Sequence, residues 1–130
     1  MLFRSMLSPD GTKLVKATEN GVMPVWNVQT GALLSSGDAH QGKINRVVFS
    51  HDSRWLLSCG DDQVARLWDT ATWREVMQYR GPRLTAWEVA ISRDNRIVAV
   101  SWQGGPCAVY DRATGAHLAQ FKSEIGRAHV

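Results

Sequence analysis

The sequence lacks the features that mark several protein classes. No stretch approaches the 18 or so consecutive apolar residues that a membrane-spanning helix requires, because charged or polar side chains recur every few positions. The two cysteines, Cys59 and Cys107, have no C-x-x-C spacing, which argues against a disulfide scaffold and a zinc site. Charge is weak as well, with 15 Lys+Arg against 12 Asp+Glu in 130 residues and the arginines scattered. These absences predict no transmembrane segment, no membrane surface and no dedicated nucleic-acid site.

Helical periodicity is missing too. No 3.6-residue apolar period is sustained over ten or more positions, and no Ser/Gly-rich linker divides the chain. Short β-branched and aromatic runs stand in its place, and the central ones span residues 44–49, 54–59, 64–68 and 75–79. Turn pairs such as Asp10-Gly11 and Asp52-Ser53 separate runs of this kind, since they cap their own backbone or tolerate left-handed φ. The pattern predicts an all-β chain of antiparallel hairpins.

The chain repeats itself every 42 residues. A turn signature follows a hydrophobic run at three places, Leu7-Ser8-Pro9-Asp10-Gly11, Phe49-Ser50-His51-Asp52-Ser53 and Ile91-Ser92-Arg93-Asp94-Asn95. A second landmark keeps the same step, at Trp26-Asn27, Trp68-Asp69 and Tyr110-Asp111. No insertion interrupts this register, so each period is expected to be one structural unit of four strands.

A period of this length, with a Trp-Asp pair closing the third of four strands, resembles the WD-repeat β-propeller family. The resemblance covers nearly the whole chain. The middle repeat is the most complete, with these features at spacings like those of the family: His40, Phe49-Ser50, Ser58, Asp61-Asp62 and Leu67-Trp68-Asp69. The resemblance implies a β-propeller fragment of about three four-stranded antiparallel blades, from a ring of seven or so.

The resemblance also implies a hydrogen-bonded structural tetrad of His40, Ser58, Asp62 and Trp68. A buried carboxylate and a buried indole N–H must find partners, and breaking one member should cost about 1–3 kcal/mol. The flanking repeats depart from the tetrad: Lys16 and Asn20 replace Ser and Asp in the first, and Pro82, Val100 and Gly104 replace His, Ser and Asp in the third. We expect those blades to depend on apolar packing instead.

The register divides the chain into blades of about residues 1–38, 39–80 and 81–124. Propellers typically close with four to eight blades, so three cannot close a ring. Met1 lies one period before Lys43, which puts the first repeat's equivalent of His40 upstream of the sequence. Ile125 to Val130 abandon the repeat and look like the translation of a sequencing-library adapter. We expect residues 1–124 to be part of a larger propeller and residues 125–130 to be non-native.

Catalytic and metal-binding interpretations are weaker. His40, Ser58 and Asp62 contain the residue types of a nucleophilic triad, but Ser58 lies mid-strand and not in a G-x-S-x-G elbow. Asp61 and Asp62 are adjacent, so in a strand they point opposite ways, unlike converging glycosidase carboxylates. Gly104-Gly105 is too short to cradle a phosphate, and the four histidines show no H-x-x-x-H spacing. We predict no catalytic residue, no cofactor and no metal site.

Trp87 is the aromatic residue that the repeat signature leaves unexplained. It lies one period after Asn45, at the entry of an innermost strand, and in the family this position points to the face where partners bind. Core packing between blades is the slightly favoured role for Trp87, but exposed aromatic residues near the mouth of a propeller are common binding anchors. The same mapping places these residues with it, as candidate partner contacts: Lys43, Asn45, Asp61, Thr85 and Gln103, with Phe3 and Glu19 on the same face.

The resemblance implies a non-enzymatic scaffold that binds other proteins or peptides through its face and rim. An alternative is a sensory or substrate-docking propeller of a larger enzyme, such as a kinase, protease or ubiquitin ligase component, and a propeller that itself catalyses is a further one. No small-molecule substrate is indicated. The sequence contains no secretory signal, and we expect a cytoplasmic protein.

Overall fold

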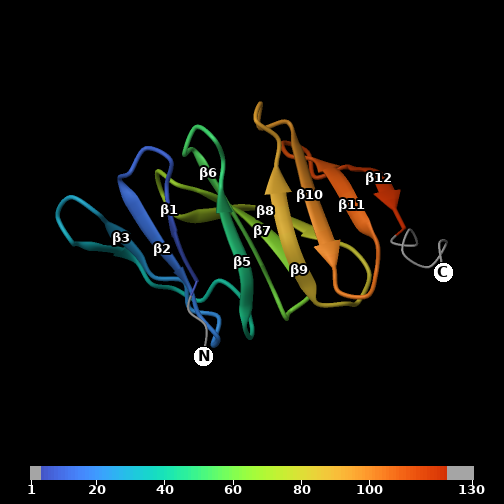
Figure 1. Cartoon of the computed structure of the whole chain (residues 1–130), viewed down its shortest axis with the longest axis horizontal. Coiled ribbons are helices and arrows are strands. Elements are labelled where there is room, and N and C mark those ends of the chain that lie inside the picture. Colours follow the sequence, from blue (N-terminus) through green and yellow to red (C-terminus); the bar gives the residue numbers. More distant parts are fainter. Residues whose placement is uncertain (1–3, 123–130) are drawn as a thin grey trace, which may run out of the picture.

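A computed structural model describes residues 4–122 of the chain, and these residues form twelve β-strands. The strands make three separate four-stranded sheets, each a meander of consecutive antiparallel strands. Figure 1 shows the three sheets standing side by side in sequence order along the long axis of the molecule. The predicted all-β, three-blade architecture is confirmed. Phe3, Met1 and the expected non-native residues 125–130 lie outside the described residues.

Each sheet is one 42-residue repeat. The first sheet contains β1 (Arg4–Leu7), β2 (Lys13–Ala17), β3 (Val25–Asn27) and β4 (Leu33–Ser35). The middle sheet contains β5 (Ile44–Phe49), β6 (Trp55–Gly60), β7 (Val64–Asp69) and β8 (Arg74–Arg80). The third sheet contains β9 (Ala86–Ile91), β10 (Ile97–Trp102), β11 (Cys107–Asp111) and β12 (His117–Phe121). The predicted central strands agree with β5 to β8 to within one residue at each end.

Apolar side chains between adjacent sheets form two cores. The core between the first and middle sheets contains Val15, Ala17, Met23, Val25, Ala39, Ile44, Val47, Phe49 and Leu56. The core between the middle and third sheets contains Leu57, Cys59, Ala65, Leu67, Tyr79, Ala86, Val89, Val98, Val100, Trp102, Ala108 and Tyr110. Because side chains alternate along a strand, the middle sheet contributes Leu56 to one core and Leu57 to the other. Burial on both faces explains why β6 is apolar almost throughout.

The two ends of the sheets differ. One end, the turn face, carries the hairpin turns 8–12, 50–54 and 92–96 and lies at the upper edge of Figure 1. In the middle repeat Ser50 Oγ donates to Asp52 Oδ1 (2.7 Å), and the same bond joins Ser92 to Asp94. Asn95 Nδ2 also donates to Asp52 Oδ2 (2.8 Å), so neighbouring turns are tied together. The opposite end, the pocket face, is where β5 and β9 begin.

Trp102 is more deeply buried than its place near a strand end suggests. Half-burial against a neighbouring blade is the expectation for Trp55, Trp73 and Trp102, but Trp102 is only 2% exposed. A Cβ atom on Gly81 would lie 2.4 Å from the Trp102 ring, and Gly81 has no such atom. The indole of Trp102 fits here because Gly81 has no side chain. Trp102 also packs edge-on against Tyr110, with 6.4 Å between the ring centroids.

Trp73 packs against the other core with its backbone in a left-handed conformation. It has a φ of 59°, whereas the positions one period before and after are glycines, Gly31 and Gly115. A left-handed conformation costs a residue with a Cβ about 1–2 kcal/mol. Trp73 offsets that cost by packing against the core between the first and middle sheets.

Candidate functional site

The middle sheet brings together the four residues of the expected tetrad. Trp68 Nε1–H donates to Ser58 Oγ (2.9 Å), Ser58 Oγ lies 2.7 Å from His40 Nε2, and His40 Nδ1 lies 2.8 Å from Asp62 Oδ1. His40 precedes β5, Ser58 lies in β6, Asp62 in the turn that follows β6, and Trp68 in β7. The chain of bonds therefore links the segment before β5 to the two strands at the centre of the sheet.

The direction of the bonds fixes the proton positions. The Asp62 carboxylate can only accept, so His40 donates from Nδ1; in the neutral ring Nε2 then accepts the hydroxyl proton of Ser58, whose oxygen accepts the Trp68 indole N–H. Burial lowers the pKa of His40 more than the bond to Asp62 raises it, which keeps the ring neutral. Burial alone would raise the pKa of Asp62, but the bonds from His40 and the Gln41 N–H, with the charge of Arg66, hold it below its ordinary value.

This order of groups is that of a nucleophilic triad, yet its surroundings favour a structural role. Ser58 is fully buried, so no substrate reaches its hydroxyl. Its oxygen already accepts the Trp68 indole proton, which weakens it as a nucleophile. A buried, fully paired relay of this kind rigidifies the sheet.

The remaining signature residues divide between packing and turn formation. Asp69 Oδ1 accepts the N–H of Ala71 (2.8 Å), and Asp111 Oδ1 accepts the N–H of Thr114 (2.9 Å). Tyr110 is buried and donates its hydroxyl to the Arg80 carbonyl (2.9 Å). Trp26 is only half-buried, although a core role follows from the signature, because it points away from Val25 and from the core on that side.

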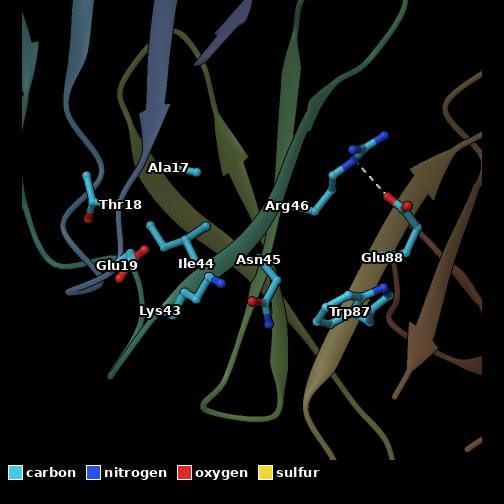
Figure 2. A pocket seen from close by; sticks show the side chains of 9 residues that line it. All are labelled: Ala17, Thr18, Glu19, Lys43, Ile44, Asn45, Arg46, Trp87 and Glu88. Atoms are coloured by element: carbon cyan, nitrogen blue, oxygen red, sulfur yellow. Dashed lines mark ion pairs between the residues drawn. The ribbon is translucent and has the colours of Figure 1, made fainter. Parts of the chain in front are cut away.

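A pocket of about 190 Å³ opens on the pocket face, between the three sheets. Figure 2 shows that side chains from all three sheets line it: Ala17, Thr18, Glu19, Lys43, Ile44, Asn45, Arg46, Trp87 and Glu88. Trp87 is 51% exposed, so it packs in neither core. An exposed indole at the wall of a pocket is an unusual surface feature, because most indoles of this size are largely buried.

The candidate contacts lie at this end of the sheets but in different environments. Lys43, Asp61 and Gln103 are exposed and Thr85 is half-buried. The Asp61 N–H donates to the Lys43 carbonyl (2.9 Å), and the Gln103 N–H donates to the Thr85 carbonyl (2.9 Å). Lys43 and Asn45, together with Glu19, join Trp87 in lining the pocket, whereas Asp61, Thr85 and Gln103 do not.

Asn45 does not fit the role of an exposed contact. It is 6% exposed, and its Nδ2 donates to Asp61 Oδ1 (3.0 Å) and to the Ala86 carbonyl of the third sheet (2.9 Å). Both amide protons are therefore committed within the chain. Asn45 ties the middle sheet to the third and forms part of the pocket floor.

One ion pair at the pocket was not predicted from the sequence. Arg46 Nε lies 2.7 Å from Glu88 Oε1, and the pair joins β5 to β9 (Figure 2). The signal was available, because Glu88 lies one period after Arg46 and carries the opposite charge. Residues at equal positions of adjacent innermost strands face each other, so opposite charges there predict a bridge.

Between residues 4 and 122 no three His, Cys, Asp or Glu side chains gather in an arrangement that could hold a metal ion. The same residues contain no helix that could cross a bilayer. The cysteines are unpaired; burial raises the pKa of Cys59 to about 12, so its thiol stays protonated and unreactive.

Comparison with known proteins agrees with the geometry. Residues 31–69 match the family model described as WD domain, G-beta repeat. The chain is 41% identical over 59 residues to nuclear distribution protein PAC1 of Arthroderma otae, covering 45% of the chain and 13% of that protein. It is 37% identical over 65 residues to WD repeat-containing protein 1 of Gallus gallus, covering 48% and 11%. It is 29% identical over 122 residues to autophagy-related protein 16 of Arabidopsis thaliana, covering 91% and 24%.

The matches and the three blades define the class. Residues 31–69 form a WD repeat, the three four-stranded antiparallel sheets are those of a WD-repeat β-propeller fragment, and WD repeats are in general protein-interaction modules. The matched regions span at most about a quarter of the length of these relatives.

Proposed function

We propose that the chain is a non-enzymatic scaffold module that binds a protein or peptide at its pocket face. The observation that carries the proposal is Trp87, which is 51% exposed at a pocket to which three blades contribute. Rigid aromatic side chains beside a pocket are typical anchors, because they bury a large area with little loss of conformational entropy.

The walls of the pocket supply the polar part of recognition. The first blade presents Glu19, the middle blade Lys43 and the third blade Trp87 (Figure 2). A partner segment that crosses the pocket meets an acid, a base and an indole in turn. Three blades held by two apolar cores keep these groups in fixed relative positions, which favours binding without reordering.

We also propose that the chain has no enzymatic role, and the burial of its Ser-His-Asp arrangement supports this. The one Ser-His-Asp arrangement in residues 4–122 is buried with its hydroxyl engaged. Activity of a nucleophilic triad requires an accessible oxygen and donors for an oxyanion.

Trp87→Ala tests the proposal. Proteins captured from cells by the tagged chain would be quantified by mass spectrometry for wild type and for the variant. We expect capture of the specific partners to fall at least about tenfold, since a central aromatic anchor contributes about 2 kcal/mol or more. The melting temperature should barely change, because Trp87 lies outside both cores.

The matched control is Phe121→Ala, which removes another exposed aromatic ring, on the outer strand β12. The control should capture the partners as wild type does. Equal capture by wild type and Trp87→Ala would contradict binding at the pocket face, and equal loss in both variants would indicate nonspecific hydrophobic capture.

A further inference from the structure

Two arginines share one indole on the turn face, where the middle and third sheets meet. The guanidinium carbon of Arg112 lies 4.6 Å from the Trp55 ring centroid, and that of Arg54 lies 5.5 Å away. Arg96 is next to them, because its carbonyl accepts the N–H of Arg112 (2.9 Å). Arg54 and Arg96 are exposed and Arg112 is half-buried. Two guanidinium groups thus share one indole at a seam between blades, with the exposed residue Arg96 next to Arg112.

The acidic residues of this face are occupied by their own turns. Asp52 Oδ1 accepts from Ser50 Oγ and the Arg54 N–H, and its Oδ2 accepts from Asn95. Asp94 accepts from Ser92 Oγ and the Arg96 N–H, and Asp111 accepts from the Thr114 N–H. None of the ion pairs found among residues 4–122 involves Arg54, Arg96 or Arg112.

The carboxylates lower the net charge of the face but do not use the arginine donors. The face therefore offers guanidinium groups without an ion-pair partner in the described part of the chain, two of them on exposed residues, beside carboxylates whose oxygens accept hydrogen bonds from neutral donors. A guanidinium fork matches a carboxylate with two parallel hydrogen bonds. Such a surface recognises the geometry of an anion rather than a broad positive potential.

The arginines are also held in place before any partner arrives. Stacking on Trp55 restricts Arg54 and Arg112, and Arg112 Nε donates to the Asn95 carbonyl (2.6 Å). Asn95 is in turn bonded to Asp52 of the neighbouring turn (2.8 Å). A side chain fixed in this way loses less conformational entropy on binding than a free surface arginine does.

We propose that this arginine cluster, Arg54 and Arg112 on Trp55 with Arg96 next to Arg112, is a second binding surface that takes an acidic segment of a partner protein. It lies at the opposite end of the strands from the Trp87 pocket, so it is independent of the function proposed above. Side-chain carboxylates of Asp or Glu would form forked bonds with the guanidinium groups, and the rim of Trp55 would contact the peptide backbone.

The test uses the whole chain and a fluorescent eight-residue Glu-rich peptide as probe, with binding followed by anisotropy. Arg54→Gln/Arg96→Gln removes two exposed guanidinium groups and leaves the bonds of Arg112 intact. The matched control, Arg80→Gln/Arg83→Gln, removes the same charge from the other end of the sheets. We expect the first variant to weaken binding at least about fivefold and the control to weaken it less than about twofold.

Three results would overturn the proposal. One is equal weakening in both variants, which would indicate attraction to net charge alone. Another is tighter binding of a single-stranded oligonucleotide of equal charge, lost in the same variant, which would make the surface a nucleic-acid site. The third is a set of backbone amide NMR shifts on peptide addition that avoids residues 52–55, 93–96 and 112. Shifts confined to those residues would support it.

Discussion

The middle and third blades keep the same 42-residue register but differ at one corner, where the second strand of each blade ends. The ring packed there is a hydrogen-bonded imidazole in the middle blade and, in the third, an indole without a hydrogen-bond partner among residues 4–122. In the middle blade the ring at the corner belongs to His40, and Gly60 leaves room for it and for the Lys43 carbonyl, since a Cβ there would lie 3.1 Å from the imidazole and 2.6 Å from that oxygen. One period later Gly60 becomes Trp102, and the residue that makes room is Gly81. A blade of this type can thus take its corner ring from either side of the sheet, provided that the facing position is glycine.

With Trp102 in place of His40 at the corner, the buried polar side-chain groups differ in whether they have hydrogen-bond partners. Every polar side-chain group of the tetrad has a partner, because Trp68 donates to Ser58 and His40 bridges Ser58 to Asp62. In the third blade Trp102 Nε1 is buried with no hydrogen-bond partner among the described residues. The third blade offsets that cost by apolar contact, with Trp102 and Tyr79 both packed on Tyr110. The middle blade should therefore depend on hydrogen-bond geometry and the third on volume.

Trp102→Ala should have the largest effect on stability. It empties the centre of the core between the middle and third blades, and truncation of a buried tryptophan costs about 3–5 kcal/mol. Urea unfolding of the purified chain measures the loss. Trp102→Phe, which keeps a ring and removes the unpaired N–H, should cost clearly less than Trp102→Ala.

Gly81→Ala probes the same contact from the opposite side. The added Cβ would meet the Trp102 ring at 2.4 Å, so overpacking should cost about 1–3 kcal/mol. If the clash is the cause, Gly81→Ala should cost much less in the Trp102→Phe background. Additive costs would show that Gly81 matters for another reason.

The register made most of the fold predictable from sequence. Strands β5 to β8 lie where the β-branched and aromatic runs predict them, the three sheets follow the 42-residue repeat, and the four bonded tetrad residues are those that the resemblance to WD repeats implies. The pocket face could also be predicted from the sequence, since the 42-residue mapping places Trp87 and Lys43 on the same face.

The features that could not be predicted depend on contacts between residues on different elements, and the 42-residue repeat does not say which of these residues face each other. Trp102 is buried because of Gly81, and Asn45 turns inward because the Ala86 carbonyl of the next blade lies within bonding distance. Both effects involve residues about 20 to 41 positions apart in the sequence, on different elements. The sequence holds these pairs, but only the packed blades identify them as neighbours.

Ser58→Ala should have a moderate effect on the middle blade. It leaves the Trp68 indole N–H and His40 Nε2 without their shared partner, and an unpaired buried polar group costs about 1–3 kcal/mol. Combined with Trp68→Phe the two losses should be less than additive, since both remove the same bond. The control, Ser101→Ala, deletes a half-buried hydroxyl of the third blade and should cost less than about 0.5 kcal/mol. Comparable costs at the two serines would contradict the view that the tetrad stabilises the blade.

Mild acid should destabilise the middle blade more than the third, and this is the smallest of the expected effects. The pKa of His40 is lowered by burial below its ordinary value of 6.5, so the unfolded chain takes up a proton before the folded chain does. The free energy of unfolding should then fall as the pH drops below 6.5, and the fall should continue until the pH reaches the lowered pKa of the folded state. Asp62 acts in the same direction only at lower pH, because its pKa lies below 3.8. Hydrogen exchange between about pH 7.5 and pH 5.5, corrected for intrinsic rates, should show protection in β6 and β7 falling more than in β10 and β11. His40→Gln should remove the difference, whereas an equal loss in both blades of the wild type would show that the imidazole of His40 is not what makes the middle blade sensitive to acid.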